Sequence, residues 1–282
     1  MTILAGCGRT DDASKSGKDI SSFMEDYRSA VSSSDYIVHA LGGEEDRSYI
    51  NSIDMLDKAY KEGLRVFEAD ISFTSDGVLV LAHSGEDNVW SKNDWEKRLG
   101  QKYPFDDESV KDYECYDADK HLCSYEVFNS FKIQGRYTAN SFAELLDYME
   151  EHRDMYLMVD AGHRSYADTK AYYEAIVEAA DGRTQVLDRL IAGGQTTDMV
   201  KAAREVYDFP LINLYFDKDE DRESIIYSAE DFVRYCDVEG ITSLSIAKEV
   251  FTENEESEAE HILSLGADMV GTDFLWSEEK KN

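Results

Sequence analysis

Five residues that could carry out metal or acid–base chemistry lie in or directly after short apolar runs. Glu68 and Asp70 are two residues apart, so on a β-strand their side chains point to the same side. His39, His83 and Asp160 each follow a further run. Inward-facing carboxylates are costly to bury without a cation. Three carboxylates, with water and phosphate completing the coordination, suit Mg²⁺ or Ca²⁺ better than Zn²⁺, and two flanking histidines can act as acid and base on a phosphoester.

The elements that would position these residues alternate between strands and helices. The apolar runs are mostly continuous, as in strands that are buried on both faces. They span residues 36–38, 64–71, 78–82, 155–159, 189–192, 211–215, 241–246 and 269–273. Helical patterns fill most of the gaps, at 52–62, 141–151, 171–180, 197–207, 229–236 and 257–265. This order predicts an α/β fold, a (β/α)₈ TIM barrel whose active site lies at the carboxyl ends of the strands.

Two connections interrupt the alternation. Residues 74–77 form a turn that is too short for a crossover helix between the second and third strands. An insertion at about residues 85–134 is longer than a barrel loop needs, and it is charged and aromatic, as lids and substrate walls often are. We expect one barrel domain over residues 31–278, preceded by a separate start and polar tether over residues 1–30.

The amino-terminal residues Leu4, Ala5, Gly6 and Cys7 resemble the lipobox of bacterial lipoproteins, in which the cysteine is lipidated. The polar residues that follow fit a tether. Only six residues precede Cys7 and none of them is basic, so a secretory signal would require a start further upstream. On this interpretation the protein is an extracytoplasmic lipoprotein with membrane anchoring through Cys7; otherwise it is soluble.

The composition excludes some partners. The chain of 282 residues has 29 Lys+Arg and 60 Asp+Glu, a net charge of −31. Nucleic-acid binding needs clustered basic residues, so we expect no nucleic-acid partner. Hydrophobic residues make up 42% of the chain, which is enough for one sizeable core.

The ordered motifs resemble those of the glycerophosphodiester phosphodiesterases, a TIM-barrel family of the PLC-like phosphodiesterase superfamily. The amino-terminal matches are His39, Asn51-Ser52, Gly63, Glu68-Ala69-Asp70, Thr74-Ser75-Asp76-Gly77 and His83. Gly266-Ala267-Asp268 and Gly271-Thr272-Asp273-Phe274 resemble the closing motif of the family. The resemblance covers residues 36–276, and the short second connection of the family fold accounts for the missing helix after Ile71.

The resemblance implies a role for each of the five residues. His39 and His83 correspond to the catalytic acid/base pair, and the sequence leaves open which is which. Glu68 and Asp70 correspond to metal ligands. The third family ligand is commonly Glu, and its equivalent here is Asp160, which also retains a carboxylate for the metal.

Two departures affect the phosphate. The Arg that follows the first His in the family is Ala40 here, and the Lys that follows the third ligand by two residues is Gly162. In the family these two basic residues hold the phosphate, so their loss weakens its binding unless another group compensates. Our candidates for substrate binding are His163, Arg164, Gln195 and Trp276.

The sequence therefore predicts a metal-dependent phosphodiester hydrolase that cleaves glycerophosphodiesters to glycerol phosphate and an alcohol. The expected partner is a small-molecule phosphodiester or a phospholipid head group, and the expected cofactor is Mg²⁺ or Ca²⁺.

Three alternatives remain open. In a phospholipase C or D type of lipid phosphodiesterase, the insertion at 85–134 would face the membrane. A barrel that has lost its phosphate contacts at Ala40 and Gly162 would bind a sugar or polymer without turnover. A glycosidase would use paired carboxylates, but this interpretation explains neither the histidines nor their order.

Overall fold

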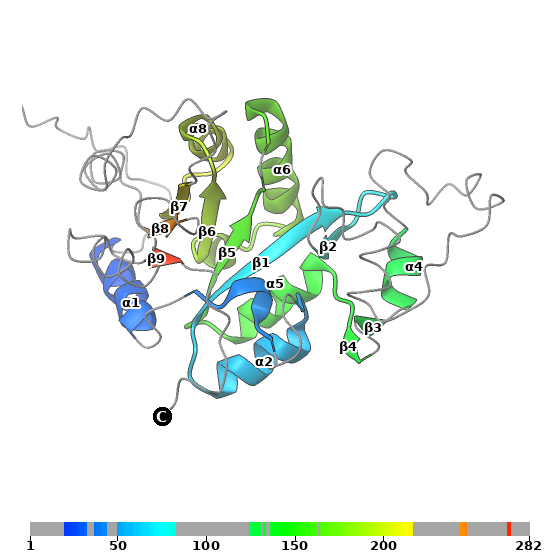
Figure 1. Ribbon diagram of the computed structural model, residues 1–282. Helices are drawn as coiled ribbons and strands as arrows, with labels where there is room; N and C mark the ends of the chain where they lie inside the picture. The colour runs from blue at the N-terminus through cyan, green and yellow to red at the C-terminus, as the bar shows by residue number, and fades with distance from the viewer. Residues whose placement is uncertain are drawn as a thin grey trace, which may run out of the picture.

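The computed structural model describes residues 20–32, 37–43, 50–82, 124–130, 132–133, 136–162, 164–216, 243–246 and 270–271. Seven strands form one sheet in the order β2-β1-β5-β6-β7-β8-β9 (Figure 1). The strands are β1 (Val66–Phe73), β2 (Leu79–Leu81), β5 (Tyr156–Asp160), β6 (Leu190–Gly194), β7 (Leu211–Phe216), β8 (Ser243–Ile246) and β9 (Val270–Gly271). All neighbouring pairs are parallel except β1 and β2.

Each predicted strand from the second onward overlaps one strand of this sheet. The first run contributes Val38, which makes an isolated parallel bridge to Phe67. The third predicted strand, β2, runs antiparallel to the distal half of β1, as the short connection at residues 74–77 predicts, and β1 pairs directly with β5. Thr74 and Gly77 are joined by a backbone hydrogen bond of 2.9 Å, and the chain reverses there. Within the described residues the sheet does not close on itself.

The described helices bury apolar residues against the sheet and its connections. They are α1 (Ile20–Ser32), η1 (His39–Leu41), α2 (Ile53–Lys61), α4 (Tyr125–Ser130), α5 (Phe142–Glu151), α6 (Tyr166–Ala179), α7 (Thr184–Leu187) and α8 (Thr197–Val206). Helices α2 and α5 lie on one side of β1, and α6 and α8 lie on the other (Figure 1). None of the helices described is long and apolar enough to cross a membrane.

Side-chain hydrogen bonds at the amino ends set where these helices begin. Ser52 accepts from Asp54 at α2, and Ser141 forms a capping box with Glu144 at α5. Helix α6 begins five residues before the predicted start at 171, because Ser165 caps it by accepting from the backbone of Asp168. Helix α7 is not predicted by the sequence pattern, and the helices predicted at 229–236 and 257–265 lie outside the described residues.

The described end of the predicted insertion packs on the hairpin of β1 and β2. Residues 124–133 include α4 and β3 (Lys132–Ile133), and β3 pairs with β4 (Tyr137–Thr138) in a separate hairpin. Phe128 and Ile133 join Val80 in a small apolar cluster. The rest of the insertion lies outside the described residues.

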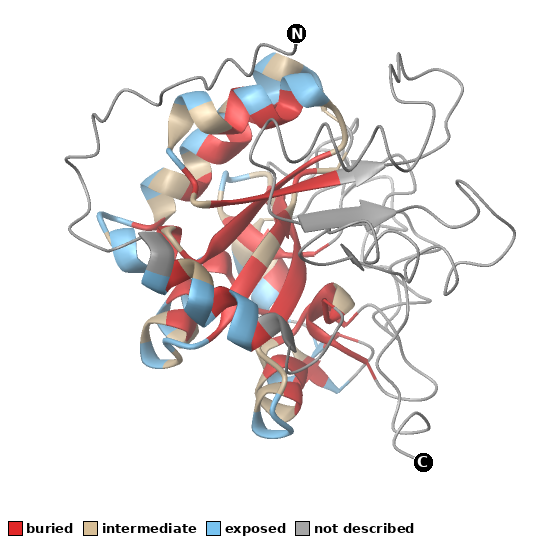
Figure 2. Cartoon of the chain, turned by 90° about the vertical axis from the view of Figure 1, so that its left-hand side faces the viewer, coloured by how far each residue is buried: buried red, intermediate tan, exposed pale blue. Residues whose placement is uncertain are grey.

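Alternate residues of the strands serve two different environments. Phe67, Ala69, Leu157 and Val159 are buried in the main core with the helices (Figure 2). The intervening residues of β1 and β5 therefore point to the opposite, inner face of the sheet. The sequence pattern thus places Glu68, Asp70 and Asp160 on the inner face, with Asp70 and Asp160 opposite each other and Glu68 earlier on β1.

Helix α1 covers the amino ends of the strands. Phe23 and Tyr27 are buried, and their rings make edge contacts with Tyr156 at centroid distances of 6.1 and 5.2 Å. The tether predicted over residues 1–30 therefore cannot include residues 20–30. The spacing of Phe23, Tyr27 and Ala30, which are all buried, is the helical signal for this segment.

The buried guanidinium of Arg189 connects several elements at the amino ends of the strands. Arg189 is 3% exposed and donates to the carbonyl oxygens of His152, Met155, Met149 and Gln185 at 2.7–3.0 Å. These carbonyls belong to the end of α5, the approach to β5 and helix α7. One side chain therefore links α7 to the end of α5 and the approach to β5, which precede it in the sequence.

Replacing this guanidinium tests its contribution to stability. We expect Arg189→Met to lower the free energy of unfolding by about 2–4 kcal/mol, because the buried carbonyl groups lose their donors. Arg153→Met removes the same charge from an exposed position nearby and should cost no more than about 0.5 kcal/mol. Urea unfolding followed by circular dichroism measures both, and equal losses would contradict the assignment.

Candidate active site

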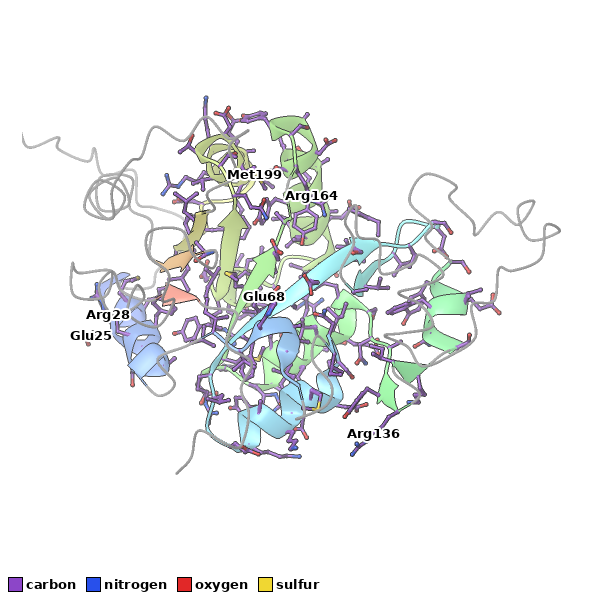
Figure 3. The ribbon with its side chains drawn as sticks, viewed as in Figure 1. Glu25, Arg28, Glu68, Arg136, Arg164 and Met199 are labelled. Carbon is purple, nitrogen blue, oxygen red and sulfur yellow. The ribbon has the colours of Figure 1, made fainter. Side chains whose placement is uncertain are left out.

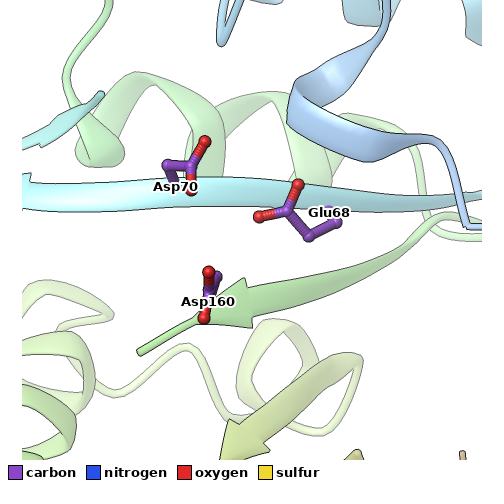
Figure 4. Close-up of side chains that lie close together, drawn as sticks. All are labelled: Glu68, Asp70 and Asp160. Carbon is purple, nitrogen blue, oxygen red and sulfur yellow. The ribbon is translucent and has the colours of Figure 1, made fainter. Parts of the chain in front are cut away.

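Three carboxylates from two adjacent strands meet on the inner face of the sheet. Asp70 is the direct register partner of Asp160, and Glu68 lies one pleat earlier on β1, opposite Met158. One oxygen from each carboxylate can be chosen so that all three lie within 4.8 Å of one another (Figure 4). Glu68 and Asp70 are 3% and 4% exposed, and Asp160 is partly buried. The register of two strands thus concentrates negative charge in a small, largely buried volume.

The carboxylate of Asp70 is held by a side chain from outside the sheet. Asn51 Nδ2 donates to Asp70 Oδ2 at 2.7 Å, and the backbone N–H of Asp70 donates to Asn51 Oδ1 at 3.0 Å. Both residues are buried, so the amide has little freedom to leave this arrangement. Asn51 has a φ of +49°, in the left-handed region that Asn tolerates better than most residues.

The carboxylate of Glu68 is held by a backbone group. The N–H of Ala40 donates to Glu68 Oε2 at 2.6 Å. Ala40 has a φ of +48°, a conformation that is unfavourable for a residue with a Cβ. Its carbonyl accepts from the N–H of Asn51 at 2.8 Å. The two left-handed residues therefore support each other and orient the two carboxylates of β1.

His39 lies beside the same carboxylate. Its Nε2 is 3.7 Å from Glu68 Oε2, and its side chain is 22% exposed. It directly follows Val38, whose N–H and carbonyl are bonded to Val66 and Glu68 on β1. The first predicted strand is thus short, but it places His39 at the edge of the acidic cluster.

Asp160 is the last residue of β5 and is oriented by the loop that follows. The N–H of Gly162 donates to Asp160 Oδ1 at 2.7 Å, and Gly162 has a φ of +58°. The buried Tyr172 on α6 donates its hydroxyl to the carbonyl oxygen of Asp160 at 2.9 Å. A side chain at position 162 would be strained at this φ, so glycine there suits the turn that brings an N–H to the carboxylate.

The structure places only part of the predicted site. It brings Glu68, Asp70, Asp160 and His39 together, and Gln195 follows β6 in a half-buried position at the same end of the sheet. Arg164 lies between β5 and α6, with its guanidinium carbon 4.6 Å from the centroid of the Tyr172 ring. His83, His163, Trp276 and Cys7 lie outside the described residues.

Three contributions to the site are not predicted by the sequence. Asn51 and Tyr172 hold ligand residues through side-chain hydrogen bonds, and Ala40 does so through its backbone. The Asn51-Ser52 pair signals only a helix start. A backbone donor leaves no trace in residue type, so nothing in the sequence points to Ala40.

The donor set fits a hard divalent cation. All three candidate ligands offer carboxylate oxygens, which Mg²⁺ and Ca²⁺ prefer and which leave coordination positions for water or a phosphate oxygen. Two of the three carboxylates are nearly inaccessible to bulk water, so a cation would relieve repulsion that solvent cannot. The residues present therefore fit a metal, and Glu68, Asp70 and Asp160 are the residues that would hold it.

An α/β fold with an acidic cluster at the carboxyl ends of its strands is the arrangement of barrel enzymes. The chain belongs to the glycerophosphoryl diester phosphodiesterase family, whose family model matches residues 42–276. It is accordingly a phosphoric diester hydrolase with a TIM-barrel fold. The comparison with curated proteins found no significant match.

Solved structures of low sequence identity share the fold. A glycerophosphodiester phosphodiesterase from Parabacteroides distasonis is 15% identical with a TM-score of 0.55, and the match covers 84% of this chain and 92% of that one. A putative glycerophosphodiester phosphodiesterase from Galdieria sulphuraria is 12% identical with a TM-score of 0.58 and the same coverage. A phosphodiesterase from Oleispira antarctica, in complex with the product sn-glycerol-3-phosphate, is 13% identical with a TM-score of 0.50, covering 85% and 93%.

The hydrogen bonds of Asn51 are open to a direct test. Asn51→Gly keeps the left-handed backbone without strain and removes both hydrogen bonds to Asp70, so we expect divalent-cation affinity to fall about 10-fold or more. Asn129→Gly, on the exposed face of α4, removes the same side chain away from the site. Calorimetric titration with Mg²⁺ and Ca²⁺ measures the affinity, and an unchanged value for Asn51→Gly would show that Asp70 needs no such support.

Proposed function

We propose that this enzyme is a metal-dependent hydrolase of glycerophosphodiesters, releasing glycerol phosphate and an alcohol. The observation that carries the proposal is the cluster of Glu68, Asp70 and Asp160, with His39 beside it. When bound there, Mg²⁺ or Ca²⁺ would polarise a phosphodiester oxygen and stabilise the charge that develops on it. Family membership supports the reaction class, and the product complex of the Oleispira antarctica relative supports a glycerol phosphate product.

The residues of the chain supply the proton transfers. His39, whose Nε2 is 3.7 Å from Glu68 Oε2, is one member of the proposed acid/base pair. His83 is the proposed second member. The residue before it, Ala82, donates its N–H to the carbonyl of Asp70, one of the three residues of the cluster, at 2.9 Å. One histidine would assist attack on phosphorus and the other would protonate the departing alkoxide.

The substrate and the location of the enzyme are further parts of the proposal. A small phosphodiester fits an enzyme whose cluster lies on the inner face of a sheet at the ends of its strands. Anchoring to a membrane through a lipidated Cys7 remains our proposal for its location and rests on the Leu-Ala-Gly-Cys motif alone.

A hydrolysis assay on glycerophosphocholine and bis(p-nitrophenyl) phosphate, with and without Mg²⁺ or Ca²⁺, tests the function. We expect His39→Ala and Glu68→Ala to lower kcat by about 100-fold or more, since each removes a group that acts on the transition state. His152→Ala, which removes a histidine that stacks on Tyr148 at the opposite end of the sheet, should retain turnover and serves as the control. Equal activity in the wild type and both site variants would sink the assignment.

The same assay separates soluble from lipid substrates. Hydrolysis of glycerophosphocholine supports the proposal, whereas hydrolysis of phosphatidylcholine vesicles without hydrolysis of glycerophosphocholine would point to a lipid phosphodiesterase instead.

A further inference from the structure

The acidic cluster keeps an excess of negative charge even when a divalent cation is bound. The three carboxylates carry three negative charges, of which a divalent cation offsets two. A bound phosphodiester brings a further negative charge into a volume where two of the carboxylates are almost fully buried. On the proposed function, an additional cationic group near the substrate would lower this cost.

Arg164 is placed to provide that charge. It lies four residues after Asp160 in the loop that leads from β5 to α6, beyond the carboxyl end of β5 (Figure 3). Its guanidinium carbon is 4.6 Å from the centroid of the Tyr172 ring, a cation–π arrangement. Its Nε is buried and has no hydrogen-bond partner among the described residues. The Tyr172 ring therefore restrains the guanidinium, and Arg164 Nε has no acceptor among the described residues.

Tyr172 links this guanidinium to the acidic cluster. The ring is buried, and the hydroxyl donates to the carbonyl oxygen of Asp160 at 2.9 Å. The same ring lies against the guanidinium of Arg164, so one side chain contacts both Arg164 and a residue of the cluster.

Several other basic residues are engaged elsewhere. Arg65 pairs with Asp154, Lys170 with Glu205, Arg183 with Asp147, and Arg189 with four carbonyl groups. None of these four lies in a loop that follows the carboxyl end of a site strand. Arg164, in contrast, lies in the loop that follows the carboxyl end of β5.

We propose that Arg164, oriented by stacking on Tyr172, binds the phosphate group of the substrate and so supplies the contact that Ala40 and Gly162 cannot make. A guanidinium presents planar, forked donors that match two oxygens of a phosphate. The ring restrains the plane of the fork before substrate arrives, which reduces the entropy lost on binding. This inference rests on the proposed function and adds to it the residue that holds the phosphodiester.

Three variants test the inference through substrate affinity. With Mg²⁺ present and glycerophosphocholine as substrate, we expect Arg164→Met to raise KM by about 10- to 100-fold, the effect of losing a charged hydrogen bond. Arg164→Lys, which keeps the charge but loses the fork, should raise KM less. Arg136→Met is the matched control, because Arg136 also lies over a tyrosine ring, that of Tyr137, but on the separate hairpin of β3 and β4, and its KM should not change.

A binding measurement separates failure of this inference from failure of the proposed function. Calorimetric titration with sn-glycerol-3-phosphate in the presence of Mg²⁺ should show affinity reduced in Arg164→Met by the same factor as KM rises. Titration with Mg²⁺ alone should give wild-type affinity, because Arg164 is not a metal ligand. If the wild type hydrolyses glycerophosphocholine and Arg164→Met matches it in KM and in product affinity, this inference is wrong and the function stands.

Two further outcomes complete the test. If the wild type neither hydrolyses the substrate nor binds the product, the proposed function fails and this inference fails with it. If Arg164→Met loses affinity for Mg²⁺ as well as for the product, the residue organises the site and does not hold the phosphate. Vesicles of phosphatidylcholine, assayed in parallel, distinguish a lipid head group from a soluble diester as the source of the phosphate that Arg164 contacts.

Discussion

Repulsion among three carboxylates is the constraint around which the described part of this barrel is organised. The parallel register sets Asp70 opposite Asp160, and the pleat brings Glu68 to the same face, so their oxygens lie within 4.8 Å. An N–H group orients each carboxylate: the side-chain amide of Asn51 for Asp70, the backbone of Ala40 for Glu68 and the backbone of Gly162 for Asp160. Neutral donors fix the geometry without neutralising the charge, which is the arrangement expected when a cation is to be bound.

The two ends of the sheet have different tasks. At the amino ends, α1 covers the strands with Phe23 and Tyr27, and Arg189 satisfies carbonyls of three elements. At the carboxyl ends, the chain holds Ala40 and Asn51 in left-handed conformations, which are unfavourable by themselves. Apolar packing at one end can therefore offset strain and charge repulsion at the other, as is general for barrels whose loops carry the chemistry.

The sequence is sufficient where residue type and periodicity carry the information. Buried strands have continuous apolar runs, so the amino-acid pattern alone assigns the ligands Glu68, Asp70 and Asp160 to one end of a barrel. Two features cannot be predicted in this way. The N–H of Ala40 carries no side-chain signature, and the hydrogen bond from Tyr172 to Asp160 joins residues whose proximity only the packing of α6 on the sheet creates. Helix α1 could have been predicted from the sequence, because its buried residues Phe23, Tyr27 and Ala30 have helical spacing. The polar residues between them make this spacing less evident.

The central claim is that Glu68, Asp70 and Asp160 bind one divalent cation. The most direct test is an anomalous difference map from crystals grown with Mn²⁺, an oxygen-preferring ion that can stand in for Mg²⁺. The account predicts a single strong peak on the inner face of the sheet, at a bonding distance of about 2.0–2.6 Å from an oxygen of each of the three carboxylates. A map without a peak between these residues, from crystals grown at a Mn²⁺ concentration at least as high as the one that supports turnover, would contradict the account.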